Sequence, residues 1–535
     1  MWAKNLLFLG LIAGGAVTLG VNLLPPRHVK PRTSYDPAAY KQPDFLDTVR
    51  HVDQSFQETW TTENVTPAKP ADELTIARRL SLGLVGTVPS LEEVRQFEQL
   101  PAGERLPWWI DHLMQDKRFA DYFGERLARA FVGTEDGPFL LYRRRKFVTW
   151  LGAEVAQNRP YDQIVRQVIA TEGLWTDKPA TNFVSVTAQQ EKGNAPNPVR
   201  LAGRVTRAFL GLRLDCAQCH NHPFAEWKQK DFESFSAFFG QTHVGFRGIE
   251  DGDGKYEVED PKTQEKRVVE PRVAFAPELL PGHGPLREQL AVWVTHPKNP
   301  YFAKAAVNRV WAVLCGQPLV TPIDNLQTDS FQPPALQILA ADFAEHGFDL
   351  RRLIRVIAQT QVYRLDSQCE HDPGKEAERT WGLFPLTRLR PEQVAGGVLQ
   401  ASSVSTLDAE THIVFRLLRA ANENNFVKRY GDSGDDEFDG RGGTIPQRLV
   451  MMNGELVSEK VKEGPMTAVT RIKWSAPDDP RAVEVAYLAV LSRRPTPEEA
   501  AHFTERLKDT SASRGEHLQD LFWTLINSTE FSWNH

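Results

Sequence analysis

Apolar residues recur at helical spacing along most of the 535-residue chain, and prolines or glycines end each run. Between residues 71 and 100, one apolar run stops at the Gly86 to Pro89 break. Ser90, with Glu93 three residues later, then forms a capping box that opens the next helix, and Thr496 with Glu499 repeats this pattern near the C-terminus. Comparable spacing predicts further helices over about 103–116, 118–133, 138–157 and 161–172. The sequence therefore predicts a mainly α fold.

One internal segment interrupts the helical pattern. Residues 242–285 contain turn residues at Asp251 to Gly254 and at Asp260-Pro261, which flank short alternating runs and predict a β-hairpin excursion. Helical spacing resumes from about residue 286. Because the chain is too long for a single core, we expect two helical domains, at 45–241 and 286–535, with the excursion at 242–285 between them.

The first 24 residues predict a membrane anchor or a signal peptide. Leu6 to Leu24 contains no charged side chain, and about 19 apolar residues are enough to cross a bilayer as a helix. The run is long for a cleaved signal, and no clear cleavage site precedes Pro25-Pro26, which favours an uncleaved anchor. Residues 25–44, rich in proline and polar residues, are expected to be a tether. We expect the protein to be exported to the periplasmic side and held at the membrane by this helix.

Charge and motifs narrow the classes of function. The chain has 63 basic and 69 acidic residues, a formal charge of -6, so it offers no broad positive field for a phosphate backbone, and nucleic acid is not an expected partner. The sequence has no G-x-S-x-G elbow, phosphate-binding loop or H-E-x-x-H motif, which lowers the expectation of a hydrolase.

The segment "LDCAQCHNHPF", residues 214–224, holds two of the four cysteines. If it is helical, Cys216, Cys219 and His220 share one face, and Asp215 is placed to cap the helix start. C-x-x-C-H is the signature of covalent haem attachment: the thiols add to the two vinyl groups of the porphyrin, and the histidine becomes the proximal iron ligand. The expected cofactor is haem c.

Two other interpretations of the segment stay open. Cys216, Cys219, His220 and His222 have spacing suited to a zinc site. Alternatively, Cys216 and Cys219 form a disulfide and the histidines are structural. The nearby arginines, Arg200, Arg204 and Arg207, are expected to form a solvent-exposed helix face rather than to contact haem propionates.

Several stretches resemble conserved blocks of a planctomycete-type two-domain family. They include "GLRLDCAQCHNHPFAEWKQKDFESFSAFFG", "NPYFAKAAVNRVWAVLCGQPLV" and "LSRRPTPEEA", and the resemblance covers nearly all of residues 45–510. It implies a cytochrome-c-like domain of unknown function that bears the C-A-Q-C-H-x-H-P motif, followed by a planctomycete-specific C-terminal domain, also of unknown function. It further implies export, and it supplies no established reaction.

From these observations we expect a membrane-anchored, extracytoplasmic, c-type haem-binding protein with a redox or electron-transfer role and a redox partner protein. The alternatives are a protein that binds zinc or another metal through the same Cys/His cluster and acts on cell-surface polymers, or a structural or adaptor protein.

Overall fold

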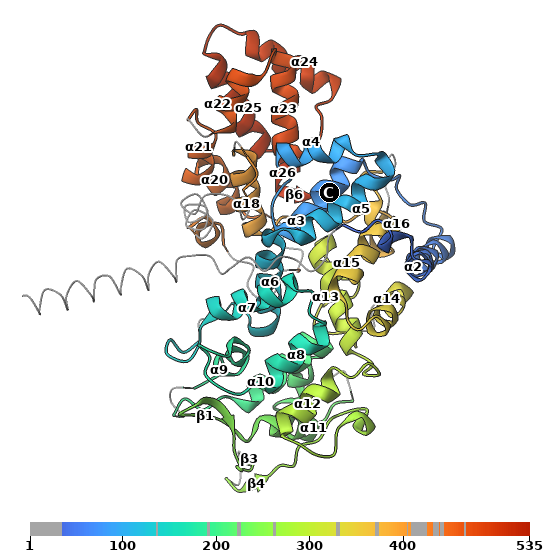
Figure 1. Cartoon of the computed structure of the whole chain (residues 1–535), viewed down its shortest axis with the longest axis vertical. Coiled ribbons are helices and arrows are strands. Elements are labelled where there is room, and N and C mark those ends of the chain that lie inside the picture. The colour runs from blue at the N-terminus through green and yellow to red at the C-terminus, as the bar shows by residue number, and fades with distance from the viewer. Residues whose placement is uncertain are drawn as a thin grey trace, which may run out of the picture.

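The computed structural model describes residues 35–134, 137–189, 193–221, 226–259, 264–327, 332–369, 374–403, 405–407, 425–431, 438, 443–464 and 467–535. It is mainly helical, as predicted, with small antiparallel strand pairs (Figure 1). Within these residues no helix has the length and apolarity needed to cross a membrane. The anchor predicted at Leu6 to Leu24 lies outside the described residues.

The first half of the chain is built from short helices joined by tight turns. In chain order these are α2 (Pro43–Thr62), α3 (Glu73–Val85), α4 (Leu91–Gln99), α5 (Ala102–Gln115), α6 (Lys117–Val132), α7 (Arg144–Ala156), α8 (Tyr161–Ala170), α9 (Asn182–Ser185), α10 (Pro198–Val205) and α11 (Gln229–Ser236). The Ser90–Glu93 capping box opens α4, as the sequence predicts, and the structure confirms helices α5, α6 and α8 within two residues of their predicted bounds.

Helix α7 begins later than predicted. The sequence places its start near residue 138, whereas the helix starts at Arg144. The backbone N–H of Arg143 donates to Asn182 Oδ1 at 2.6 Å, and Phe139 and Leu140 are largely exposed in the turn before it. A contact with a distant residue thus fixes the end of the turn, and local spacing could not reveal it.

The predicted β excursion is present as two hairpins. Strands β1 (Thr242–Gly245) and β2 (Gly248–Asp251) pair antiparallel, with Thr242 opposite Asp251. Strands β3 (Glu257–Glu259) and β4 (Lys266–Val268) form the second pair, so the predicted turn at Asp251 to Gly254 separates the two hairpins. β1, β3 and β4 are seen at the lower end of Figure 1.

The second half of the chain is helical again. Its elements are α12 (Leu286–Val294), α13 (Phe302–Cys315), α14 (Pro334–Glu345), α15 (Leu350–Gln359), α16 (Gln361–Arg364), α17 (Gly374–Arg379), β5 (Thr387–Arg388), α18 (Pro391–Ala401), α20 (Ile445–Asn453), α21 (Glu455–Lys460), α22 (Ala468–Ser475), α23 (Asp479–Leu491), α24 (Pro497–Lys508), α25 (Arg514–Ile526), α26 (Thr529–Ser532) and β6 (Trp533–Asn534). The predicted capping box of Thr496 and Glu499 opens α24.

Two hydrophobic cores organise these elements. The larger runs from Tyr40 to Phe384, because α2 packs on α14, α8 on α12 and α3 on α13. This core is continuous across residues 242–285. The smaller core contains mainly residues from Leu389 to Phe531, whose helices form the upper end of Figure 1. The domain boundaries proposed from the sequence stay a prediction.

Helix α3 and the end of the chain join the two cores. Leu80 and Leu84 of α3 belong to the larger core, whereas Leu82 belongs to the smaller one. Strand β6 returns to pair with β5, and Figure 1 shows the C-terminus beside α5 in the middle of the molecule.

Candidate functional site

The helix that leads to the cysteine motif ends in a turn that requires glycine. Asn197 caps α10 by accepting from the backbone N–H groups of Val199 and Arg200, and α10 continues into one π-helical stretch, η4 (Thr206–Leu210). Gly211 then adopts φ +60°, and a Cβ there would lie 2.9 Å from Leu326 Cγ. Glycine therefore lets the chain turn back against the loop that contains Leu326.

The cysteine motif follows in a short 3₁₀ helix, η5 (Leu214–Ala217), and a bend. The expected α-helical face is thus not formed. The side chains of Leu214 and Ala217 are buried and hold the segment to the core, whereas Cys216 and Cys219 are exposed and their thiols are free. The motif is therefore a surface segment anchored by its apolar residues, with both sulfurs accessible.

Asp215 does not cap this helix, contrary to the prediction. It lies inside η5, which has no side-chain cap, and both of its carboxylate oxygens accept from Arg207 Nε, at 3.0 and 2.9 Å. An arginine eight residues upstream supplies a stronger donor than a backbone N–H, because both partners are charged.

Hydrogen bonds hold the bend that follows. The backbone N–H of Gln229 donates to Asn221 Oδ1 at 3.1 Å, and its side-chain amide donates to the carbonyl of Gln218 at 3.3 Å. The first residues of α11 therefore fix the loop that contains Cys219 and His220.

The imidazole of His220 is exposed, and its Nδ1 lies 2.7 Å from the backbone oxygen of Asn221. A carbonyl oxygen can only accept a hydrogen bond, so Nδ1 carries the proton. In the neutral ring, the lone pair is then on Nε2. Metal-binding histidines commonly show this arrangement, because the hydrogen bond fixes the tautomer and the ring orientation.

An ion-pair network lies directly behind the motif. Arg207 binds Asp215 and also donates to Asp324 at 2.8 Å, and Arg213 binds Asp324 at 2.7 Å. Burial alone would lower the pKa of Arg207, but its hydrogen bonds to Asp215 and the charges of both aspartates raise it above its ordinary value. The network ties the motif to the loop that follows α13.

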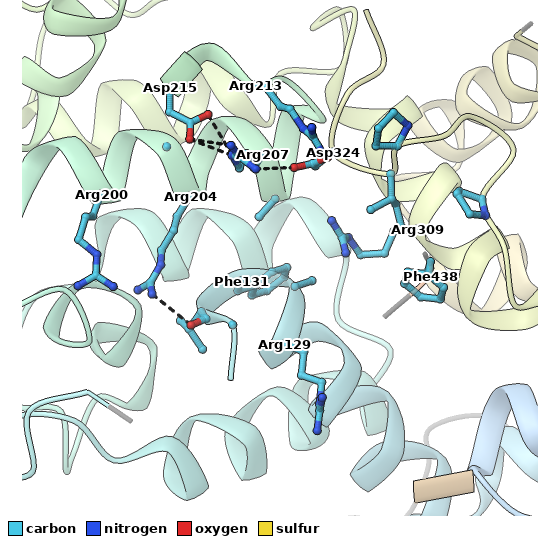
Figure 2. Close-up of a pocket in the computed structure, with 18 of the residues that line it drawn as sticks. Arg129, Phe131, Arg200, Arg204, Arg207, Arg213, Asp215, Arg309, Asp324 and Phe438 are labelled. Atoms are coloured by element: carbon cyan, nitrogen blue, oxygen red, sulfur yellow. Dashed lines mark hydrogen bonds and ion pairs between the residues drawn. The ribbon is translucent and has the colours of Figure 1, made fainter. Parts of the chain in front are cut away.

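The network forms one wall of a cavity of about 610 Å³ (Figure 2). Asp215 and Gln218 of the motif line it, and Phe131 from α6 and Phe438 contribute aromatic surface. The described charged residues of its walls are two aspartates and six arginines: Asp215, Asp324, Arg129, Arg200, Arg204, Arg207, Arg213 and Arg309. Among the described lining residues, arginines thus outnumber aspartates by four, and one of these arginines, Arg129, pairs with Glu125 at 3.1 Å.

Sequence reasoning missed most of this cavity. Arg200, Arg204 and Arg207 were expected to face solvent, whereas they line the cavity and are partly buried. Arg309 and Asp324 carried no signal in the sequence, because they reach the site only through the packing of α13 and the loop after it.

The structure brings Cys216, Cys219 and His220 together in one exposed segment. His222, the remaining predicted zinc ligand, lies outside the described residues. Among the described residues, no group of three or more His, Cys, Asp or Glu side chains is arranged to hold a metal ion. The thiols of Cys315, buried in α13 as predicted, and Cys369 are also free.

Comparison with known proteins gives two matches. Residues 51–244 match the model of the PSCyt2 family, described as a protein of unknown function (DUF1549), and residues 286–425 match PSD1, described as a protein of unknown function (DUF1553). No curated protein and no solved structure matches the chain. The two matches lie in this order along the chain, DUF1549 followed by DUF1553, and both families are of unknown function.

Proposed function

We propose that this protein binds haem covalently through Cys216 and Cys219, with His220 as the axial ligand of the iron, and that it has a redox or electron-transfer role. One observation carries the proposal. The thiols of Cys216 and Cys219 are free and exposed, and the Nδ1 of His220 donates to the backbone carbonyl of Asn221. That hydrogen bond leaves Nε2 as the ligating nitrogen.

The attachment chemistry is balanced without an oxidant. Each thiol adds across one vinyl C=C bond, so that an S–H bond is replaced by a C–S bond and the proton goes to the neighbouring vinyl carbon. Bound haem supplies one-electron chemistry at the iron. The exposed position of both sulfurs suits a reaction in which a bulky porphyrin and the attachment machinery must reach them.

We further propose that the protein acts outside the cytoplasm, attached through residues 6–24. The sequence supports this attachment, because the run from Leu6 to Leu24 has no charged side chain and is long enough to cross a bilayer as a helix. A redox partner would approach the exposed edge at Cys216, Cys219 and His220.

The test is purification of the full chain from a host that attaches haem to exported proteins. We expect a Soret band that persists after denaturation and is lost when Cys216 and Cys219 are both changed to serine. Cys369→Ser is the matched control, because that thiol lies outside the motif, and it should retain the band.

A colourless protein would contradict the haem proposal. If such a protein contains one equivalent of zinc that the Cys216→Ser/Cys219→Ser variant loses, the zinc alternative with Cys216, Cys219, His220 and His222 replaces it. A colourless protein without metal would leave a structural or adaptor role.

A further inference from the structure

Four large apolar side chains protrude from turns on one side of the molecule. We propose that these residues, Phe139, Leu140, Leu174 and Phe246, together called the apolar loop surface, bind the surface of an anionic lipid bilayer. None of them takes part in the proposed haem attachment. The surface would bind lipid in addition to the proposed membrane helix at residues 6–24.

The turn before α7 directs two apolar side chains inward and two outward. The carbonyl of Pro138 accepts from the backbone N–H groups of Leu141 and Tyr142, both at 2.9 Å, and these bonds close the turn. Leu141 and Tyr142 are buried. Phe139 and Leu140, by contrast, are 82% and 71% exposed. Because hydrogen bonds and buried neighbours fix the turn, it holds this exposed pair outside the core.

The segment before α9 lies beside this turn. The side chain of Asn182, in α9, accepts a hydrogen bond from the backbone N–H of Arg143 at 2.6 Å and donates to the carbonyl of Trp175 at 2.9 Å. Asn182 thereby joins the end of the first turn to the segment that contains Leu174, which is 41% exposed. The third apolar side chain is therefore a neighbour of the first two.

The β1–β2 hairpin adds the fourth apolar side chain. Gly173 and Ile249 exchange two backbone hydrogen bonds, each of 2.9 Å, which places Leu174 beside the end of the hairpin. A Cβ on Gly248 would lie 2.2 Å from the carbonyl oxygen of Gly173, so only glycine allows this close approach. Phe246 is fully exposed in the hairpin turn two residues before Gly248. Figure 1 shows α7, α9 and β1 along the same side of the molecule.

Exposed basic side chains lie among these apolar residues. Arg145, Lys146 and Lys178 are exposed, and no ion pair of the described residues involves Arg145 or Lys178. Lys146 donates from Nζ to the carbonyl of Thr176 at 3.0 Å. A carbonyl is uncharged, so the ammonium keeps its charge and can still attract a phosphate headgroup.

The acidic side chains of the same segments offset only part of this charge. Glu250 lies 3.5 Å from Arg247, and Glu172 lies 3.9 Å from the buried Arg287. Asp177 is exposed. Among the described residues around the apolar loop surface, the remaining positive charges therefore exceed the negative ones, which suits a layer of anionic headgroups.

The shape of the apolar loop surface favours a fluid partner over a protein. Its side chains protrude from three separate turns, whereas the core of a protein interface packs closely and has complementary shape. In a bilayer, Phe and Leu side chains enter the boundary of headgroups and acyl chains one by one, while Lys and Arg contact the headgroups. The proposed attachment through residues 6–24 would also bring a bilayer within reach of this surface.

The experiment uses the full-length chain with its uncharged run interrupted by Leu11→Arg and Val17→Arg, so that the membrane helix no longer forms. Flotation with vesicles of equal parts phosphatidylcholine and phosphatidylglycerol measures binding. We expect this chain to bind the vesicles, and Phe139→Ser or Phe246→Ser should each weaken binding about tenfold, because a large apolar side chain no longer leaves water.

Two further variants separate the contributions of apolar contact and charge. Trp474→Ser is the matched control, since Trp474 is equally exposed on α22 and lies outside the apolar loop surface. It should leave binding unchanged. Arg145→Gln/Lys146→Gln should weaken binding to these vesicles about tenfold and should not change binding to vesicles of phosphatidylcholine alone.

Absence of vesicle binding by the interrupted chain would overturn the proposal, as would unchanged binding in Phe139→Ser and Phe246→Ser. Equal losses in Phe139→Ser and Trp474→Ser would do the same, because binding would then follow exposed hydrophobicity in general. If sedimentation instead shows a dimer that Phe139→Ser dissociates, a second copy of the chain covers the surface and the bilayer proposal is wrong. Attachment through residues 6–24 is tested separately, because the unmodified chain and its Phe139→Ser variant should both resist extraction from membranes by alkaline carbonate.

Discussion

Arginine has different partners in two regions of this molecule. On α3, Arg78 and Arg79 are 2% and 0% exposed, and they donate to backbone carbonyls: Arg78 to Val490 at 3.0 Å, and Arg79 to Leu365 at 2.6 Å. The guanidinium of Arg79 also lies 3.7 Å from the centre of the Phe384 ring. Burial lowers the pKa of both to about 10.

In the cavity, by contrast, Arg207 and Arg213 have carboxylate partners, and Arg204 donates to the backbone carbonyl of Val132 at 3.2 Å. The side chain of Arg207 is 40% exposed, and its pKa is raised by Asp215 and Asp324 despite partial burial. The difference shows that the partners of an arginine, as well as its burial, set the direction in which its pKa shifts. Arg78 and Arg79 fasten the end of the chain to the larger core, whereas Arg207 and Arg213 tie the cysteine motif to the loop that contains Asp324.

The largest expected effect comes from the α3 region. Arg79→Met should lower the free energy of unfolding by roughly 3–5 kcal/mol, because several buried carbonyls lose their donor at once. Denaturant unfolding measures this loss. An unchanged free energy of unfolding would contradict the structural role assigned to Arg79.

A buried arginine with a carboxylate partner gives the next largest effect. Arg118 pairs with Glu93 at the start of α4. Burial by itself would raise the pKa of Glu93, but the approach of His112 to 3.5 Å, the charge of Arg118 and a hydrogen bond from the backbone N–H of Ser90 lower it to about 2. The folded state therefore binds this proton less readily than the unfolded state.

This contribution to stability is present above pH 4.5 and is lost as the pH falls toward 2. The shift from 4.5 to about 2 corresponds to about 3 kcal/mol. We expect Glu93→Gln to be less stable than the unmodified protein by about this amount at pH 7, with the difference shrinking as unfolding is measured at lower pH. A difference that does not change with pH would contradict the assigned pKa.

A smaller effect is expected in the cavity. Asp324→Asn removes a negative charge shared by Arg207 and Arg213. It should lower the free energy of unfolding by about 1 kcal/mol or less, since these pairs are partly exposed. A loss as large as that of Arg79→Met would contradict the smaller structural role assigned to this ion-pair network.

The sequence predicts those features of the fold that depend on interactions between residues close together in the chain. The Ser90–Glu93 and Thr496–Glu499 capping boxes depend on residues three apart, and both are present. The start of α7 was missed because the contact between Arg143 and Asn182 decides it. The sequence assigned Asp215 to a cap because its stronger partner, Arg207, lies on the other side of the turn at Gly211.

The candidate site also has one part that the sequence predicts and one part that it does not. Cys216, Cys219 and His220 lie within five residues, so their spacing alone marks them. The cavity combines residues as distant as Arg129, Arg213 and Arg309, which only the packing of α6, α10 and α13 brings together. No pattern within one segment could have indicated it.

The covalent state of Cys216 and Cys219 decides the proposed function, and the mass of the proteolytic peptide that contains both measures it most directly. For protein from a haem-attaching host, we predict a peptide heavier by one haem, bound through two thioether bonds. The same peptide with two free thiols, or with a disulfide, would contradict covalent haem binding.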